Sequence, residues 1–322
     1  MIFQHSAPAK THRLCFARSS GIMGMKTRRK GASILGILSL FRSDPHTALI
    51  LLLYQIPAIL IALTLHELAH GYVALKCGDP TAQMLGRLSF NPLKHLDPIG
   101  TLFMVLFGFG WARPVPVNSR NFKHFRRDEL LVSLAGVTMN FCLFFVTMLA
   151  MTLVNELLWK PELWAWSSTG PLICRRDFLS SDGFIFYSVI SGENVLFAEA
   201  ASKTSGYLLN LDVLGIPDAF TYYLRTPWLL YIQRFLMFFS IINLSLCLFN
   251  LLPIPPLDGY HVVNDIFLRG RLHIPAKVVN VLMIGMLILL YFTSFISTAI
   301  STAVSFVQGA VVSGILTVFG LG

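Results

Sequence analysis

Charged residues are scarce in this sequence, and its few cysteines form no recognisable pairs. Asp, Glu, Lys and Arg make up 13% of the 322 residues, whereas 55% are hydrophobic. Soluble domains carry about 25% charged residues, so a water-soluble globular protein is excluded. None of the five cysteines lies in a C-x-x-C pair, which argues against a disulfide framework or a cysteine-based zinc site.

Acidic residues are absent from the first 43 positions, where much of the formal net charge of +9 arises. A basic segment of this kind more often contacts anionic lipid head groups than nucleic acid, so no nucleic-acid partner is expected. Residues 1–45 are therefore predicted to be a basic tail, an organelle targeting segment, or sequence upstream of a true start at Met23 or Met25.

Long apolar runs, by contrast, are abundant. A membrane-spanning helix needs roughly 20 mostly apolar residues, and the runs at 47–77, 130–158 and 228–252 are long enough. Two further runs follow at 278–296 and 299–321. The pattern predicts an all-α polytopic membrane protein with four to five transmembrane helices.

The apolar run at 98–111 has only about half the length of a span and is flanked by basic residues on both sides. It fits a re-entrant segment that enters and leaves by one face. The neighbouring pieces 84–95 and 112–122 alternate and contain Pro, which indicates strands or extended loops. His95 and His124, in these basic flanks, are predicted to be solvated.

The pattern H-E-x-x-H occurs at His66-Glu67-Leu68-Ala69-His70, inside the first long apolar run. Residues four apart share a helical face, so both imidazoles can bind one Zn²⁺, and Glu67 is placed to take a proton from a zinc-bound water. The five-residue pattern also arises by accident. Ionisable groups are costly in hydrocarbon, however, so the cluster is expected to line a functional cavity.

A catalytic zinc usually has three protein ligands, so one is missing from this motif. Asp258 follows a proline-rich break, Asn250-Leu-Leu-Pro-Ile-Pro-Pro-Leu-Asp258-Gly259, at the end of a later apolar run. Broken backbone at membrane depth is tolerated only inside protein or beside a water-filled cavity. Asp258 is therefore predicted as the third ligand; the alternative is a solvated turn.

Two asparagines, Asn140 and Asn250, lie in otherwise apolar helices. One interpretation is that they hydrogen-bond the substrate backbone or the oxyanion. The other is that they join helices to one another, for which buried Asn is well suited.

These motifs resemble the site-2 protease family of intramembrane zinc metalloproteases. The resemblance is carried by HELAH at 66–70, SLAGVTMN at 133–140 and NLLPIPPLDG at 250–259, together with GDPTAQMLGRLSFNPLKHLDPIG at 78–100 and GFGWARPVPVN at 108–118. It implies one zinc ion on His66, His70 and Asp258, Glu67 as general base, and substrate binding at Asn140. It further implies regulated cleavage of single-span membrane proteins. No PDZ- or CBS-like domain is evident.

The expected organisation follows the motifs. The catalytic core is predicted in two halves, 46–160 with HELAH and 227–268 with NLLPIPPLDG. An extramembrane loop or subdomain at 161–226 separates them, and transmembrane segments at 269–322 follow.

The basic segments beside the motifs place the active site nearer the cytosolic side, in a bacterial plasma membrane or an organelle membrane. The oligomeric state is not predicted. The alternative function is a non-proteolytic membrane metal-binding protein or ion transporter that uses the same His/Asp cluster.

Overall fold

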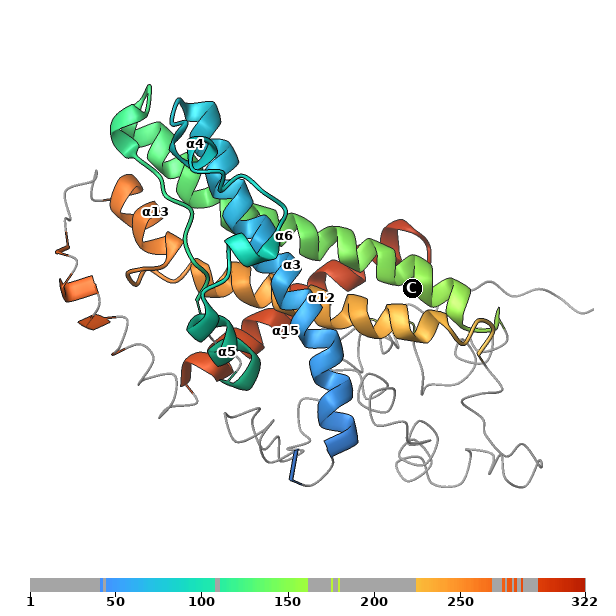
Figure 1. Cartoon of the computed structure of the whole chain (residues 1–322). Helices are drawn as coiled ribbons and strands as arrows, with labels where there is room; N and C mark the ends of the chain where they lie inside the picture. Colours follow the sequence, from blue (N-terminus) through green and yellow to red (C-terminus); the bar gives the residue numbers. More distant parts are fainter. Residues whose placement is uncertain are drawn as a thin grey trace, which may run out of the picture. The chain divides into compact units, whose positions relative to one another are not determined.

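The helices follow the apolar runs of the sequence. The computed structural model describes residues 41–42, 45–107, 111–161, 175, 179, 224–267, 274–275, 277–279, 281–282, 285 and 295–321. In chain order, the helices are α3 (Pro45–Cys77), α4 (Thr81–Met84), η2 (Pro92–Lys94), α5 (Pro98–Phe107), η3 (Ser119–Asn121), α6 (Phe125–Leu158), α12 (Leu229–Asn250), α13 (Asp258–Ile266) and α15 (Phe295–Val318) (Figure 1).

Four of these helices are long and apolar enough to cross a membrane. They comprise Ala48–Cys77, Phe125–Leu158, Leu229–Asn250 and Thr298–Val318. The prediction of an all-α polytopic membrane protein is confirmed. The predicted run at 278–296 lies largely outside the described residues, as do most of the tail at 1–45 and most of the loop at 161–226.

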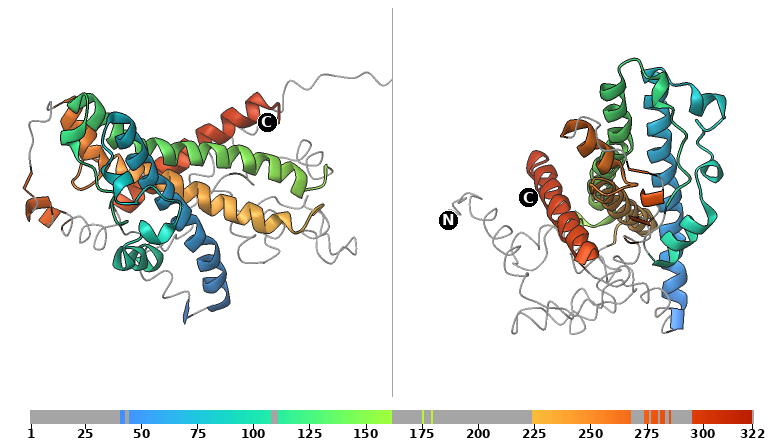
Figure 2. Two further views of the ribbon diagram at one scale, coloured as in Figure 1. Left: turned by 45° about the horizontal axis from the view of Figure 1, so that its top comes forward. Right: turned by 90° about the vertical axis from the view of Figure 1, so that its left-hand side faces the viewer.

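Small side chains let the first spanning helix pack closely. Ala58 and Ala62 of α3 are fully buried and form a cluster with Phe239 of α12. Leu143 of α6 packs against the same cluster, so α3, α6 and α12 meet at this level (Figures 1 and 2). Close packing of small residues is typical of helices in membranes, where burial from water cannot drive association.

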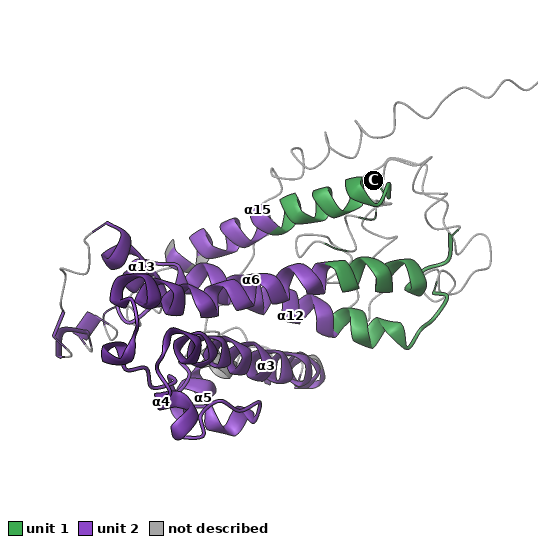
Figure 3. Ribbon diagram, turned by 90° about the horizontal axis from the view of Figure 1, so that it is seen from above, with its two compact units in different colours: residues 1–29, 149–234, 308–322 green, residues 30–148, 235–307 purple. Residues whose placement is uncertain are grey.

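The chain divides into two compact units (Figure 3). One unit comprises residues 30–148 and 235–307, and includes every residue of the predicted site. The other comprises 1–29, 149–234 and 308–322. Within this second unit, Asn155 Oδ1 accepts hydrogen bonds from Trp159 Nε1 at 3.0 Å and Gln233 Nε2 at 2.9 Å. Asn155 therefore ties the end of α6 to the start of α12.

The connection between α3 and α6 combines a short helix with extended chain. Helix α5 has ten residues, about half of what a span requires. Among the described residues of this connection no strand forms, and a single antiparallel bridge joins Leu96 to Ala112. The predicted β-like character is thus limited to extended loops around one bridge.

Polar contacts hold these loops together. Arg87 donates from Nη2 to the carbonyls of Arg113 and Pro114, at 2.9 and 3.1 Å. His95 is fully buried, with Nε2 2.7 Å from Ser89 O, and its own carbonyl accepts from Arg113 N. The prediction that His95 is solvated is wrong, because the two loops close over its ring. His124 is exposed, as expected.

Asp79 anchors the loop before α6 to the end of α3. Its fully buried carboxylate accepts from Asn118 N at 2.7 Å, from Asn121 Nδ2 at 2.8 Å, and from both the backbone N–H and the hydroxyl of Thr81. Burial alone would raise the pKa of Asp79. The hydrogen bonds from Thr81, Asn118 and Asn121 outweigh burial and hold the pKa below its ordinary value.

We expect Asp79→Asn to lower the free energy of unfolding by about 2 kcal/mol, because an amide leaves at least one buried donor without an acceptor. A depressed folded-state pKa adds stability above the unfolded pKa of about 4, and this is lost as pH falls through the folded pKa. When thermal unfolding of the full chain is followed in micelles, the melting temperature of the variant should therefore fall less than that of wild type as the pH is lowered. Asp97→Asn is the control, because the carboxylate of Asp97 accepts a hydrogen bond from the backbone N–H of Gly100. If the melting temperatures of wild type and Asp79→Asn fell equally as the pH was lowered, this role of Asp79 would be contradicted.

Candidate metal centre

The two histidines of the H-E-x-x-H pattern project from one face of α3. Their rings lie edge to face with centroids 4.7 Å apart, and the two Nε2 atoms are 3.1 Å apart. His66 is buried and His70 is half-buried. The predicted convergence of the two imidazoles is what a helical spacing of four produces.

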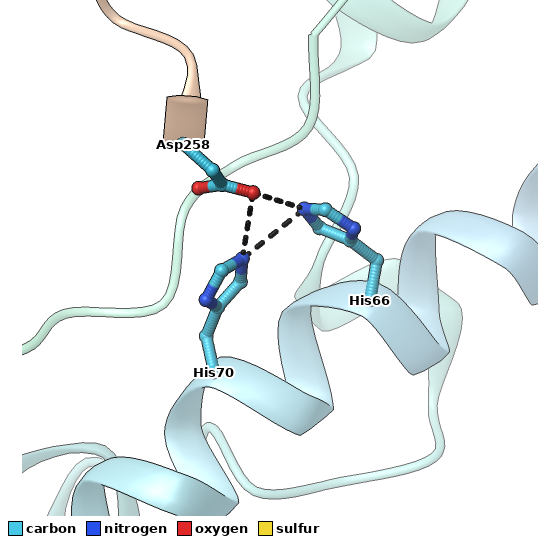
Figure 4. Close-up of side chains that lie close together, drawn as sticks. All are labelled: His66, His70 and Asp258. Atoms are coloured by element: carbon cyan, nitrogen blue, oxygen red, sulfur yellow. Dashed lines mark hydrogen bonds and ion pairs between the residues drawn. The ribbon is translucent and has the colours of Figure 1, made fainter. Parts of the chain in front are cut away.

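Asp258 joins them from a distant part of the sequence. It is the first residue of α13, directly after the proline-rich break that ends α12. Gly259 allows a close return of the chain, because a Cβ there would lie 2.6 Å from Leu252 O. Figure 4 shows the carboxylate of Asp258 facing both imidazoles.

The three donor atoms have the separations of ligands around one ion. Asp258 Oδ2 lies 3.4 Å from His66 Nε2 and 3.3 Å from His70 Nε2, which completes a near-equilateral triangle (Figure 4). Ligands at 2.0–2.1 Å around a tetrahedral zinc are about 3.3 Å apart. Asp258 Oδ2 is also buried without a hydrogen-bond partner. These residues therefore fit a zinc ion.

The electrostatics of Asp258 agree with a ligand role. Burial alone would raise the pKa of its carboxyl, but the two neighbouring imidazoles outweigh burial and hold the pKa below its ordinary value. The group is therefore ionised at neutral pH, as a metal-binding carboxylate must be.

Glu67 lies beside the histidines in sequence but takes a different partner. Its Oε2 accepts a hydrogen bond from Val115 N at 2.9 Å, and both groups are buried. Val115 lies in the loop that is held by hydrogen bonds to Arg87 and Asp79. This loop therefore contacts α3, the helix that carries the two histidines. This contact fixes one carboxylate oxygen of Glu67.

Helix α6 supplies contacts that the sequence did not reveal. Val132 O lies 2.7 Å from His70 Nδ1, and Asn140 Nδ2 lies 3.2 Å from His66 Nδ1. Gly136, between them, has no side chain to obstruct the rings. The carbonyl of Val132 leaves no signal in the sequence. Asn140 did stand out, but its contact with His66 could not be foreseen.

Asn250, the other asparagine predicted to contact substrate, is the last residue of α12. Its Nδ2 donates to Leu246 O at 3.0 Å, one turn earlier. A further buried asparagine, Asn243, donates in the same way to Phe239 O at 2.8 Å. Asn243 was not among the predicted residues, although its amide in an apolar run was an available signal in the sequence.

The comparisons with known proteins agree with this geometry. The sequence profile of peptidase family M50 matches residues 54–292, which include all three donor residues. The chain belongs to peptidase family M50. It is also 36% identical over 220 residues to "Putative zinc metalloprotease YwhC" of Bacillus subtilis (strain 168), covering 67% of this chain and 70% of that protein. No solved structure matches the chain significantly.

Membership of family M50, the site-2 protease family, makes this chain one of a family of membrane zinc metalloproteases. The resemblance read from the sequence motifs is confirmed. The metal of the family is zinc, and His66, His70 and Asp258 form a site that could hold it. Among the described residues, this is the one group of His, Cys, Asp and Glu with such geometry.

We expect Gly136→Ala to disrupt the centre of this M50 protein. An added Cβ would collide with His70 Nε2 and lie 2.5 Å from His66 Cε1, so at least one imidazole must move. Zinc affinity should fall about 10–100-fold, as when an outer-shell contact is lost, and competition with a chromophoric chelator measures it. Gly314→Ala is the control, because a Cβ there meets no atom within 4 Å. Unchanged zinc affinity in Gly136→Ala would show that α6 does not confine the rings.

Proposed function

We propose that this chain is an intramembrane endopeptidase that hydrolyses peptide bonds of single-span membrane proteins within or beside the bilayer. His66, His70 and Asp258 hold one zinc ion in this proposal, and Glu67 is the general base. The observation that carries it is the triangle of donor atoms, with sides of 3.1, 3.3 and 3.4 Å. Two of its corners belong to a helix long and apolar enough to span a membrane.

The chemistry follows from the residues around this triangle. Zinc, when bound there, supplies a Lewis acid that lowers the pKa of water to about 7 and polarises a carbonyl. Glu67 accepts the proton that water loses as it attacks the scissile carbonyl, and returns that proton to the departing amine. The hydrogen bond from Val115 N to Oε2 fixes the carboxylate, which leaves Oε1 to carry the proton.

Charge supports a cytosolic position for the centre. The loop before α6 and the first turn of α6 contain five basic residues, Arg113, Arg120, Lys123, Arg126 and Arg127. This loop contacts the site through Val115, and Lys and Arg in short loops mark the cytosolic side. We therefore propose that this side faces the cytosol, in a bacterial plasma membrane or an organelle membrane. The two core halves 46–160 and 227–268 would then together supply the catalytic centre around the metal.

Removal of the metal tests the proposal. The full chain, reconstituted in lipid vesicles with a single-span reporter, should lose cleavage on dialysis against a chelator and regain it when zinc is added back in equimolar amount. Mass spectrometry should place the cut inside the apolar segment of the reporter or at its edge. Cleavage that persists without zinc, or that falls only in distant soluble loops, would refute the proposal. An ion transporter would leave the reporter intact under all conditions.

A further inference from the structure

One face of α6 forms an outer layer around the two histidines. Val132, Gly136 and Asn140 are spaced by four residues, so they lie in one row along the helix. Val132 O is 2.7 Å from His70 Nδ1, and the amide of Asn140 is 3.2 Å from His66 Nδ1. Gly136 faces both rings, since a Cβ there would collide with them. Each imidazole of α3 therefore meets one polar group of α6.

The protonation of the rings decides what these partners must do. Both Nε2 atoms face Asp258, and a nitrogen that binds a metal must offer its lone pair. The proton of each neutral imidazole then resides on Nδ1, which becomes a donor. His70 Nδ1 has a suitable acceptor, because a carbonyl oxygen such as that of Val132 accepts only.

Among the described residues, Asn140 is the side chain that can supply the acceptor for His66. In the described part of the chain, the hydrogen-bond partner of His66 Nδ1 is the amide of Asn140, which is fully buried and whose Oδ1 has no partner. A carboxamide carries a donor and an acceptor in nearly equivalent positions. Half a turn of the amide places Oδ1 against the Nδ1–H of His66. Asn can thus serve the metal-free ring as a donor and the metal-bound ring as an acceptor.

We propose that Asn140 is a positioning residue for the metal centre, which orients His66 and holds its proton on Nδ1 so that Nε2 faces the ion. This inference rests on the zinc site of the proposed function and goes beyond it. It differs from substrate binding at Asn140, which the family resemblance implies. A side chain with no exposed surface, in contact with a candidate ligand, acts through that ligand. Groups that orient metal-bound histidines in this way are a general feature of zinc sites.

Zinc affinity of purified full-length variants tests the role of Asn140. Asn140→Leu removes the acceptor, so zinc should bind about 10–100-fold more weakly in competition with a chromophoric chelator. Asn140→Asp keeps an acceptor for Nδ1–H and should stay within a few-fold of wild type. Asn243→Leu is the matched control, because Asn243 is another fully buried asparagine, and its amide donates to Phe239 O instead. At saturating zinc, the KM of Asn140→Leu for a reporter should equal that of wild type.

The outcomes separate this proposal from its alternatives. If Asn140→Leu bound zinc as tightly as wild type, the proposal would be overturned. If its KM for the reporter were also raised, Asn140 would instead be assigned to substrate binding. Equal weakening by Asn140→Asp and Asn140→Leu would also overturn it, since the acceptor would then be irrelevant. If Asn140→Leu does not fold, Asn140→Ala replaces it under the same criteria. His66→Ala tests the zinc site itself. If the proposed site were wrong, this variant would bind zinc as tightly as wild type.

Discussion

Replacement of Glu67 by Gln is expected to reduce peptide cleavage by about 10³-fold or more while zinc stays bound. A general base of this kind contributes typically 10²–10⁴-fold to a rate, and an amide cannot accept the proton. In the wild type, Val115 N donates to Glu67 Oε2. The amide oxygen of Gln can accept the same hydrogen bond, so the local fold should be kept. Initial rates with a membrane reporter and the zinc content of the same sample are measured together.

Glu156→Gln is the matched control for this substitution. Glu156 pairs with Arg175 at 2.6 Å in the unit that does not contain the site, so its loss should leave the cleavage rate unchanged. Cleavage at the wild-type rate by Glu67→Gln would remove Glu67 from the mechanism. Loss of zinc together with activity would instead indicate that Glu67 is a ligand.

The second large effect is expected from Asp258→Ala. This change removes one corner of the donor triangle and leaves two imidazole nitrogens 3.1 Å apart. Zinc affinity should fall by more than the 10–100-fold that loss of an outer-shell partner costs, and cleavage should vanish at ordinary zinc concentrations. Chelator competition measures the first effect, and the membrane reporter measures the second.

Asp265→Ala, in the same helix α13, is the comparison for Asp258→Ala. Asp265 is also partly buried, but it does not belong to the group that could hold a metal. Zinc affinity should be unchanged by its loss. If the two variants bound zinc equally well, Asp258 would not be a ligand, and the late proline-rich segment would have only a structural role.

Much of the fold was predictable because membrane helices carry their signal in length and apolarity alone. The spanning helices at Ala48–Cys77 and Leu229–Asn250 fall within about three residues of the predicted runs at 47–77 and 228–252. The meeting of His66, His70 and Asp258 was also predicted from the sequence. A helical spacing of four fixes the first two, and a proline-broken helix end at membrane depth needs a polar cavity.

The remaining features depend on contacts between segments that no local pattern records. The burial of His95 results from two loops that close over it, through the hydrogen bond from Arg113 N. The position of Gly136 against the imidazoles requires the packing of α6 on α3. The contact of Val132 with His70 uses a backbone carbonyl, which every residue has, so its identity carries no signal.

Zinc K-edge X-ray absorption of the purified full-length protein tests most directly whether the three residues share one ion. We expect one zinc per chain, with only nitrogen and oxygen neighbours at about 2.0–2.2 Å, two imidazoles in the outer scattering, and loss of that spectrum in Asp258→Ala. A sulfur neighbour at about 2.3 Å, or an identical spectrum in Asp258→Ala, would contradict a centre built from His66, His70 and Asp258.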